Sequence, residues 1–293
     1  MKALLFFLFA VSVNAQTTTA IWPAAPPDSQ PPAGPEVVTV VTKPLVAGRP
    51  WRAITSVSTP TMSVYSPKVN ESGVAVVVFP GGAYHGIAID LEGTEACDWF
   101  VAKGITCVVL KYRVPNSGPS APAALQDAQR TVGLVRSHAA QWHIDKQKIG
   151  VLGFSAGGHL AANISTHFES RACPPADAAD HESCRPDFAV VVYPGYLSLD
   201  SKSPKLNPDI HVTTGTPPTF LLQAEDDPVA DVSNSIVYFE ALKNAGVPAE
   251  IHLYSSGGHG FGLRPTKLPI THWPELLEVW LKTIGVLRDG RPR

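Results

Sequence analysis

The sequence has few cysteines, little charge and almost no long apolar runs, and each shortage excludes a class of protein. Four cysteines in 293 residues are too few for a small scaffold held together by disulfides. Charged residues make up only 16% of the chain and nearly cancel, to a formal net charge of −2, so no nucleic-acid partner held through its phosphates is expected. Apolar residues reach 44%, which excludes a disordered chain and allows a full core.

Patterns for cofactors, metals and repeats are missing as well. The sequence has no phosphate-binding loop and no metal-ligand spacing, so we expect neither a cofactor nor a metal. It has no internal repeat, and its composition does not change after residue 37. We therefore expect one domain over residues 37–293, and the sequence leaves its oligomeric state open.

The one long apolar run lies at the N-terminus and has the pattern of an export signal. Lys2 gives a positive start, residues 3–11 are almost all apolar, and residues 13–15 offer small side chains at the positions that a signal peptidase reads. The run is too short to span a bilayer. The pattern predicts a signal peptide over residues 1–15, and therefore a secreted or periplasmic protein with no membrane contact after cleavage.

Proline is concentrated in the stretch that follows. Residues 16–36 combine these prolines with threonine, alanine and serine. Such a composition favours extended polyproline II backbone and buries little apolar surface. We expect this stretch to be a linker outside the fold. Its prolines are Pro23, Pro26, Pro27, Pro31, Pro32 and Pro35.

The cysteines fall into two pairs along the chain. Cys173 and Cys184 bracket a loop rich in proline, alanine and aspartate, and an export compartment is oxidising, so we expect a disulfide between them. Cys97 is expected in a helix and Cys107 in the following strand. A helix axis lies about 10 Å from a sheet, which is too far for a disulfide. We expect these two as buried free thiols.

Apolar strand-like runs alternate with helical patterns through the rest of the chain. Residues 74–79 are apolar without interruption, which is typical of a strand buried on both faces in a parallel sheet. Residues 123–142 place apolar side chains at three- and four-residue steps, which is typical of an amphipathic helix. The alternation predicts an α/β fold with a mostly parallel central sheet and helices on both faces. Further strands are expected at 105–110, 149–152, 189–193, 219–222 and 251–254, and further helices at 94–103, 156–166, 232–245 and 274–284.

A Gly-x-Ser-x-Gly pattern follows one of these strands and begins a helix. Gly153 and Gly157 flank Ser155 at two residues on each side. In a nucleophile elbow, such glycines permit a tight strand-to-helix turn that lifts the serine hydroxyl out of the sheet. We predict Ser155 as a nucleophile and Ala156 N–H, at the helix N-terminus, as a donor to an oxyanion. His159, four residues after the serine, is expected to pack beneath the site.

A second glycine pair follows the strand at residues 74–79. Gly81 and Gly82 come directly after Pro80. Glycines let the backbone approach a substrate closely, and acyl transfer needs N–H groups aimed at the developing oxyanion. We predict that Gly81 and Gly82 donate these N–H groups.

Candidates for the base and the acid follow the last two strands. His259 is the one histidine of ten that lies between glycines just past a strand, which favours it as the base. Asp226 and Asp227 follow the preceding strand. A carboxylate three residues before Val229 is Asp226, whereas a pattern with the acid directly before proline favours Asp227. We prefer Asp226 and keep Asp227 as the alternative. The chain order of serine, aspartate and histidine is the one expected of an α/β hydrolase.

These motifs resemble one family along most of the chain. The family is that of secreted α/β-hydrolase esterases, the acetylxylan-esterase-like and feruloyl-esterase-like group. The resemblance extends from about residue 60 to the C-terminus. It is carried by residues 110–115, 127–130, 144–145, 153–160 and 253–262.

The resemblance implies an α/β-hydrolase fold and a serine carboxylic-ester hydrolase that needs no cofactor. It maps the nucleophile to Ser155, the base to His259 and the acid to Asp226. Together with the export signal, it favours small acyl groups such as acetyl, carried by a small molecule or a polysaccharide. One departure is Ala83, which stands where related enzymes have the last glycine of His-Gly-Gly-Gly.

The substrate pocket and two alternative functions are open at this point. Tyr84, His85 and Tyr196 are candidates to line the pocket. A serine peptidase of the prolyl-oligopeptidase type would share the Asp-Asp-x-Val pattern and the order of the triad, although this chain has no room for the propeller domain that such enzymes usually carry. A non-catalytic secreted binding module on a hydrolase fold is the second alternative.

Overall fold

An eight-stranded sheet forms the centre of the computed structural model, which describes residues 15–29, 34–114 and 122–288. The strand order is β1-β4-β7-β5-β8-β9-β10-β11. Neighbours from β7 to β11 run parallel, whereas β1 and β4 pair antiparallel at one edge. The strands are β1 (Ala15–Ala20), β4 (Thr61–Ser66), β5 (Ala75–Phe79), β7 (Thr106–Lys111), β8 (Ile149–Phe154), β9 (Ala189–Val192), β10 (Thr219–Ala224) and β11 (Ala249–Tyr254).

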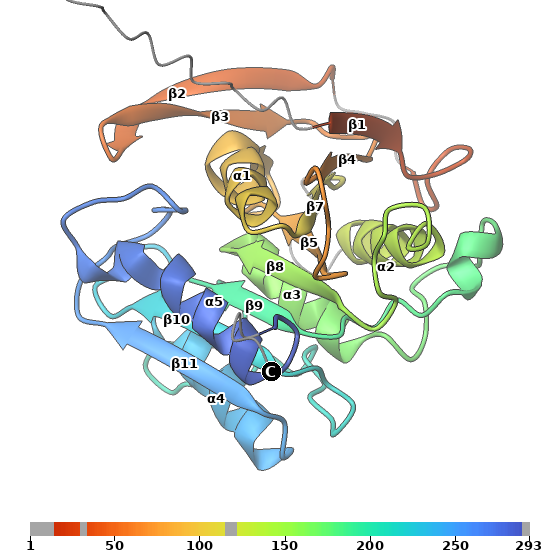
Figure 1. Ribbon diagram of the computed structural model, residues 1–293. Helices are drawn as coiled ribbons and strands as arrows, with labels where there is room; N and C mark the ends of the chain where they lie inside the picture. Colours follow the sequence, from red (N-terminus) through yellow and green to blue (C-terminus); the bar gives the residue numbers. More distant parts are fainter. Residues whose placement is uncertain (1–14, 30–33, 115–121, 289–293) are drawn as a thin grey trace, which may run out of the picture.

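Helices cover both faces of this sheet (Figure 1). Because successive side chains of a strand point to opposite faces, Val77 packs in one cluster with α2, α3 and α4, while Val76 packs in a second cluster with α1 and α5. Burial on both faces explains the uninterrupted apolar runs. The predicted α/β architecture and the five predicted helices are confirmed. The helices are α1 (Glu95–Ala102), α2 (Pro122–Ser137), α3 (Ala156–Thr166), α4 (Ser233–Asn244) and α5 (Trp273–Thr283).

A smaller, three-stranded sheet was not predicted. β2 (Val37–Val46) and β3 (Arg49–Thr55) form an antiparallel hairpin, and β6 (Gly86–Ala88) pairs with the free edge of β3. The sequence of β2, VVTVVTKPLV, is rich in the β-branched residues that favour strands, but most of its side chains are exposed and it shows no alternation of buried and exposed positions. Three short helices are η1 (Asp90–Thr94), η2 (Ala178–His181) and η3 (Pro269–His272). Within the described ranges, no helix has the length and apolar character of a membrane span.

The prediction of a linker over residues 16–36 is wrong for its described part. β1 pairs with β4 in the main sheet, and Ile21 and Trp22 are buried. Trp22 Nε1 donates a hydrogen bond of 2.8 Å to Asp127 Oδ1. A run of threonines favours a strand, and the two large apolar side chains of Ile21 and Trp22 come before all six prolines. The predicted signal peptide lies outside the described residues, apart from Ala15 at the start of β1.

The prediction for the cysteines is also wrong. Cys97 and Cys107 form a disulfide, with their Cα atoms 5.2 Å apart, whereas Cys173 and Cys184 are free. The distance of about 10 Å used in the prediction is measured from the axis of the helix. Cys97 lies on the side of α1 that packs in the core, so its Cα atom is nearer to β7 than the axis is, by up to the helix radius of about 2.3 Å. The loop before Cys184 is held by ion pairs instead, from Arg130 and Arg171 to Asp180.

The disulfide predicts a specific dependence of stability on reduction. Reducing Cys97–Cys107 is expected to lower the free energy of unfolding by about 3 kcal/mol, because the unfolded chain regains the freedom of the closed loop. Urea unfolding with and without a reductant measures the change, and the Cys97→Ala/Cys107→Ala variant should not respond. Thiol titration of the denatured, unreduced protein should find only Cys173 and Cys184. Reaction at all four positions would contradict the pairing.

Candidate active site

Ser155 lies at a sharp turn between β8 and α3. Its backbone has φ of 53° and ψ of −118°, a conformation that a non-glycine residue adopts only under strain. A Cβ atom at Gly153 would lie 1.9 Å from Gly157 O, and one at Gly157 would lie 1.9 Å from Phe79 O. No side chain fits at either position. The sequence therefore forms a nucleophile elbow with its serine at the carboxyl end of the sheet.

Ser155 and His259 are in contact, although 104 positions separate them in the chain. Ser155 Oγ lies 2.8 Å from His259 Nε2, and His259 Nδ1 lies 2.7 Å from Asp227 Oδ2. In the tautomer in which Nδ1–H donates to the carboxylate, Nε2 accepts from the serine hydroxyl. The arrangement can remove a proton from Ser155 as its oxygen attacks an electrophile.

The carboxylate that contacts His259 belongs to Asp227, so the prediction that Asp226 is the partner of the histidine is wrong. Adjacent side chains after β10 point in different directions, and only that of Asp227 is fully buried. Its Oδ1 also accepts hydrogen bonds from Val229 N–H and Ala230 N–H. The carboxylate is therefore fixed from both sides.

Asp226 has a different position, in solvent. Its Oδ1 accepts hydrogen bonds of 2.8 Å from Gly257 N–H and Gly258 N–H. These backbone donors, that of Gly258 foremost, lower the pKa of the Asp226 carboxyl. Asp226 thus anchors the loop that leads into His259 without reaching the imidazole.

The structure removes Gly81 from the predicted oxyanion donors. Gly81 N–H donates a hydrogen bond of 2.7 Å to Glu92 Oε2, so this donor is already engaged. For Gly82 N–H and Ala156 N–H, no acceptor is found in the part of the chain that the structure describes. A Cβ atom at Gly81 would lie 2.8 Å from Ser155 Cβ, so the loop packs directly on the elbow. Gly82 and Ala156 are the donors that stay available there.

Glu92 is the residue of this site that sequence reasoning missed. It is 4% exposed and lies in η1, where it also accepts a hydrogen bond of 2.9 Å from Tyr193 Oη. Burial raises the pKa of Glu92, and the nearby charge of His259 opposes this shift. In the sequence, Glu92 is marked only as an acidic residue just before a predicted helix, and such residues usually lie in solvent at the helix N-terminus.

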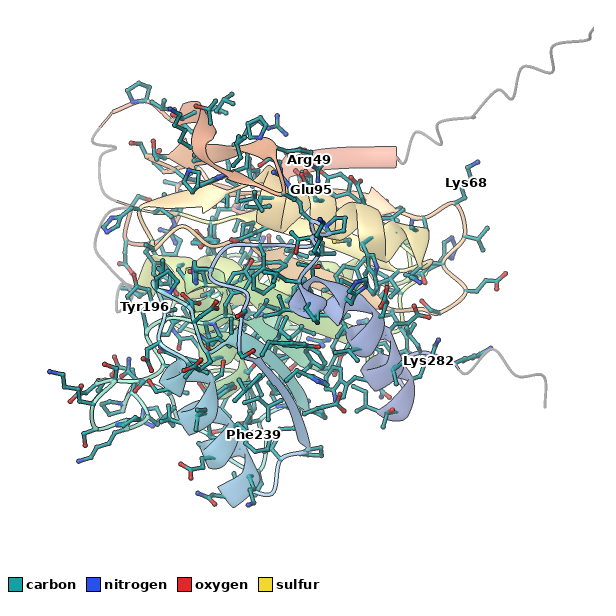
Figure 2. All side chains as sticks on the ribbon, turned by 90° about the vertical axis from the view of Figure 1, so that its left-hand side faces the viewer. Arg49, Lys68, Glu95, Tyr196, Phe239 and Lys282 are labelled. Atoms are coloured by element: carbon teal, nitrogen blue, oxygen red, sulfur yellow. A yellow bond between two sulfur atoms is a disulfide. The ribbon has the colours of Figure 1, made fainter. Side chains whose placement is uncertain are left out.

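The predicted pocket residues form an aromatic group beside the elbow. Tyr84 is buried, and its ring centroid lies 5.9 Å from that of Tyr196. Tyr196 is 38% exposed and lies near the molecular surface (Figure 2). The N–H of Gly195 donates to Ser155 O at 3.3 Å, which ties the turn of Tyr196 to the elbow. His85 is exposed on the loop that follows Gly82.

His159 is buried beneath this group, as predicted. Its Nδ1 lies 2.7 Å from Tyr84 Oη, and it makes no contact with Ser155 Oγ or Asp227 among the hydrogen bonds of the described residues. Burial lowers the pKa of His159 to about 4. It is therefore a neutral packing residue at neutral pH. The described residues include no group of three or more His, Cys, Asp or Glu side chains that could hold a metal.

Sequence comparison places the chain among known proteins. The BD-FAE family model matches residues 62–192. An acetylxylan esterase of Xylanibacter ruminicola is 33% identical in a 247-residue alignment that covers 76% of this chain and 48% of that protein. The chain thus spans about half the length of this curated relative.

Solved structures show the same class, the α/β hydrolases. The acetyl ester-xyloside bifunctional hydrolase of Caldicellulosiruptor lactoaceticus has a TM-score of 0.75 and 33% identity, covering 92% of this chain and 97% of that one. The esterase Est2 of Thermogutta terrifontis, solved with propionate, has a TM-score of 0.67 and 25% identity, covering 80% of this chain and 92% of that one. The chain belongs to the α/β-hydrolase esterases, as the sequence motifs predict.

The burial of His159 predicts a pH dependence of stability. The imidazole has an ordinary pKa of 6.5 and a folded pKa of about 4, so between these values the unfolded chain binds a proton that the folded protein does not. The stability that depends on the neutral imidazole is fully present above pH 6.5. The free energy of unfolding decreases by about 3 kcal/mol as the pH falls to 4. Urea unfolding at pH 7 and pH 4.5 should show a smaller loss in His159→Gln than in the wild type. Equal losses in the two proteins would contradict the assignment.

Proposed function

We propose that the protein is a serine carboxylic-ester hydrolase with a triad of Ser155, His259 and Asp227. The observation that carries this proposal is the continuous contact from Ser155 Oγ through the imidazole to Asp227, with distances of 2.8 and 2.7 Å. Membership in the α/β-hydrolase esterases supports the same reaction class.

The geometry supports a two-step mechanism through an acyl-enzyme. Ser155 Oγ attacks the ester carbonyl carbon while His259 Nε2 takes its proton, and Asp227 stabilises the imidazolium that forms. The carbonyl oxygen becomes an oxyanion that accepts hydrogen bonds from Gly82 N–H and Ala156 N–H. The tetrahedral intermediate collapses, and His259 gives the proton to the leaving alcohol oxygen.

Water completes the reaction by the same route. His259 removes a proton from the water as its oxygen attacks the acyl carbon of the acyl-enzyme, and then returns that proton to Ser155 Oγ. The products are a carboxylic acid and an alcohol, with the enzyme restored. Each proton has a place in the triad, so the cycle needs no cofactor.

We propose small acyl esters of carbohydrates as the substrate class. The relatives support this choice, since one is an acetylxylan esterase, one an acetyl ester-xyloside hydrolase and one an esterase solved with propionate. The exposed ring of Tyr196 offers an apolar face beside the elbow, to which a sugar ring can pack.

We also propose that the protein is exported. The N-terminal pattern of residues 1–15 supports a signal peptide. The disulfide between Cys97 and Cys107 supports an oxidising destination, because such bonds are rare where thiols are kept reduced.

The two adjacent aspartates provide a test of the triad. Ser155→Ala is expected to lower kcat for p-nitrophenyl acetate at least about 10³-fold, and Asp227→Asn about 10⁴-fold, because the imidazole loses its partner. Asp226→Asn is the matched control, expected to stay within about tenfold because an amide oxygen still accepts from the same N–H groups. Wild-type turnover by Ser155→Ala would end the proposal, and a larger loss in Asp226→Asn than in Asp227→Asn would reject Asp227 as the acid.

The acyl preference is tested with a substrate panel. Values of kcat/KM are expected to decrease from acetyl to butyryl to feruloyl esters, and acetylated xylan should release acetate. The same panel includes a dipeptide amide, which should release amine far more slowly than the acetyl ester releases alcohol. A preference for feruloyl esters would contradict the small-acyl proposal, and equal rates for amide and ester would favour a peptidase.

A further inference from the structure

A second buried carboxylate lies beside the triad and has no step in the mechanism. Glu92 is 4% exposed, and none of the ion pairs formed by described residues includes it. Both of its hydrogen-bond donors are neutral: Gly81 N–H, at 2.7 Å from Oε2, and Tyr193 Oη, at 2.9 Å from Oε1. A buried carboxylate without a cation is costly, so its two partners indicate what it does.

The first partner leads to the oxyanion donors. The peptide unit that joins Pro80 and Gly81 is held at both ends, because Tyr112 Oη donates to Pro80 O at 2.6 Å and Gly81 N–H donates to Glu92. The orientation of this unit is therefore fixed. The next peptide unit begins at Gly81 and carries Gly82 N–H, the proposed donor to the oxyanion.

The second partner leads to the base. The ring of Tyr193 packs on the imidazole of His259, with centroids 4.9 Å apart, and on Phe261, with centroids 4.6 Å apart. Its hydroxyl also accepts a hydrogen bond of 3.1 Å from Gly262 N–H. Tyr193 has a φ of 37°, which is unfavourable for a residue with a side chain, so these contacts hold it in a strained position. Glu92 thereby fixes the ring of Tyr193, on which the imidazole of His259 packs.

We propose that Glu92 is a positioning residue that sets the oxyanion donors and the base in one geometry, acting through Gly81 and Tyr193. The inference deepens the proposed function and rests on it. Glu92 does not touch the reacting atoms, so its loss should disturb the transition state more than substrate binding, and kcat should fall while KM changes little.

The test compares three variants by kcat and KM for p-nitrophenyl acetate. Glu92→Ala is expected to lower kcat about 100-fold with KM within about threefold, because a displacement of about 1 Å in the reacting groups has this effect. Glu92→Gln should recover kcat to within about tenfold, since its amide oxygen accepts from Gly81 N–H and its amide nitrogen donates to Tyr193 Oη. Tyr193→Phe should lower kcat about tenfold, and should add little to Glu92→Ala, because the two act in one network.

Glu95→Gln is the matched control, three residues further along the chain. The Glu95 carboxylate forms ion pairs with Arg264 and Arg49. Figure 2 shows Glu95 beside Arg49. Its loss is expected to leave kcat within about twofold of the wild-type value.

Each other outcome decides against one of the two proposals. A folded Glu92→Ala with wild-type kcat, or with a change in KM alone, overturns the positioning role, and so does a Glu92→Gln as slow as Glu92→Ala. If Glu92→Ala does not fold, Glu92→Gln and Tyr193→Phe decide, and full kcat in Tyr193→Phe overturns the inference. Ser155→Ala is measured in parallel, because its activity alone tells whether the esterase proposal itself has failed.

Discussion

The close backbone contact at the nucleophile elbow is the constraint on which the site depends. Gly157 lies against Phe79 O so tightly that no side chain fits between them, and Gly153 lies equally close to Gly157 O. The first turn of α3 is therefore packed backbone to backbone against the end of β5 and the end of β8. Ser155 and the loop of Gly81 and Gly82 come from these two strand ends, so their relative position follows from the sheet itself.

Three carboxylates near the site have three different tasks, which are set by their surroundings. Asp227 is buried on His259 and orients its imidazole. Asp226, the next residue, is in solvent and anchors the loop before the histidine through two backbone N–H groups. Glu92 is buried between Gly81 and Tyr193. The three carboxylates thus bind an imidazole, a loop backbone, and a glycine N–H together with a tyrosine hydroxyl. Their partners differ because the direction and burial of each side chain differ.

The sequence predicts those features that local patterns determine. Strands buried on both faces leave continuous apolar runs, and the glycines around Ser155 and His259 mark turns that few other residues allow. It does not separate Asp226 from Asp227, because adjacent residues differ here only in the direction of the side chain. It misplaces the disulfide and the N-terminal segment, because both depend on distances between parts of the chain that folding brings together. Glu92 leaves no local pattern, since its partners are a backbone N–H and a distant tyrosine.

The bond between Cys97 and Cys107 also has a consequence for the chemistry, because of where it falls in the chain. Only residues 93–96 separate Glu92 from Cys97, the residue of α1 that forms the disulfide. The disulfide thus ties α1, which follows directly on the short helix η1 that bears Glu92, to strand β7. Breaking this bond would free α1 from β7 and so loosen the support of the helix that holds Glu92.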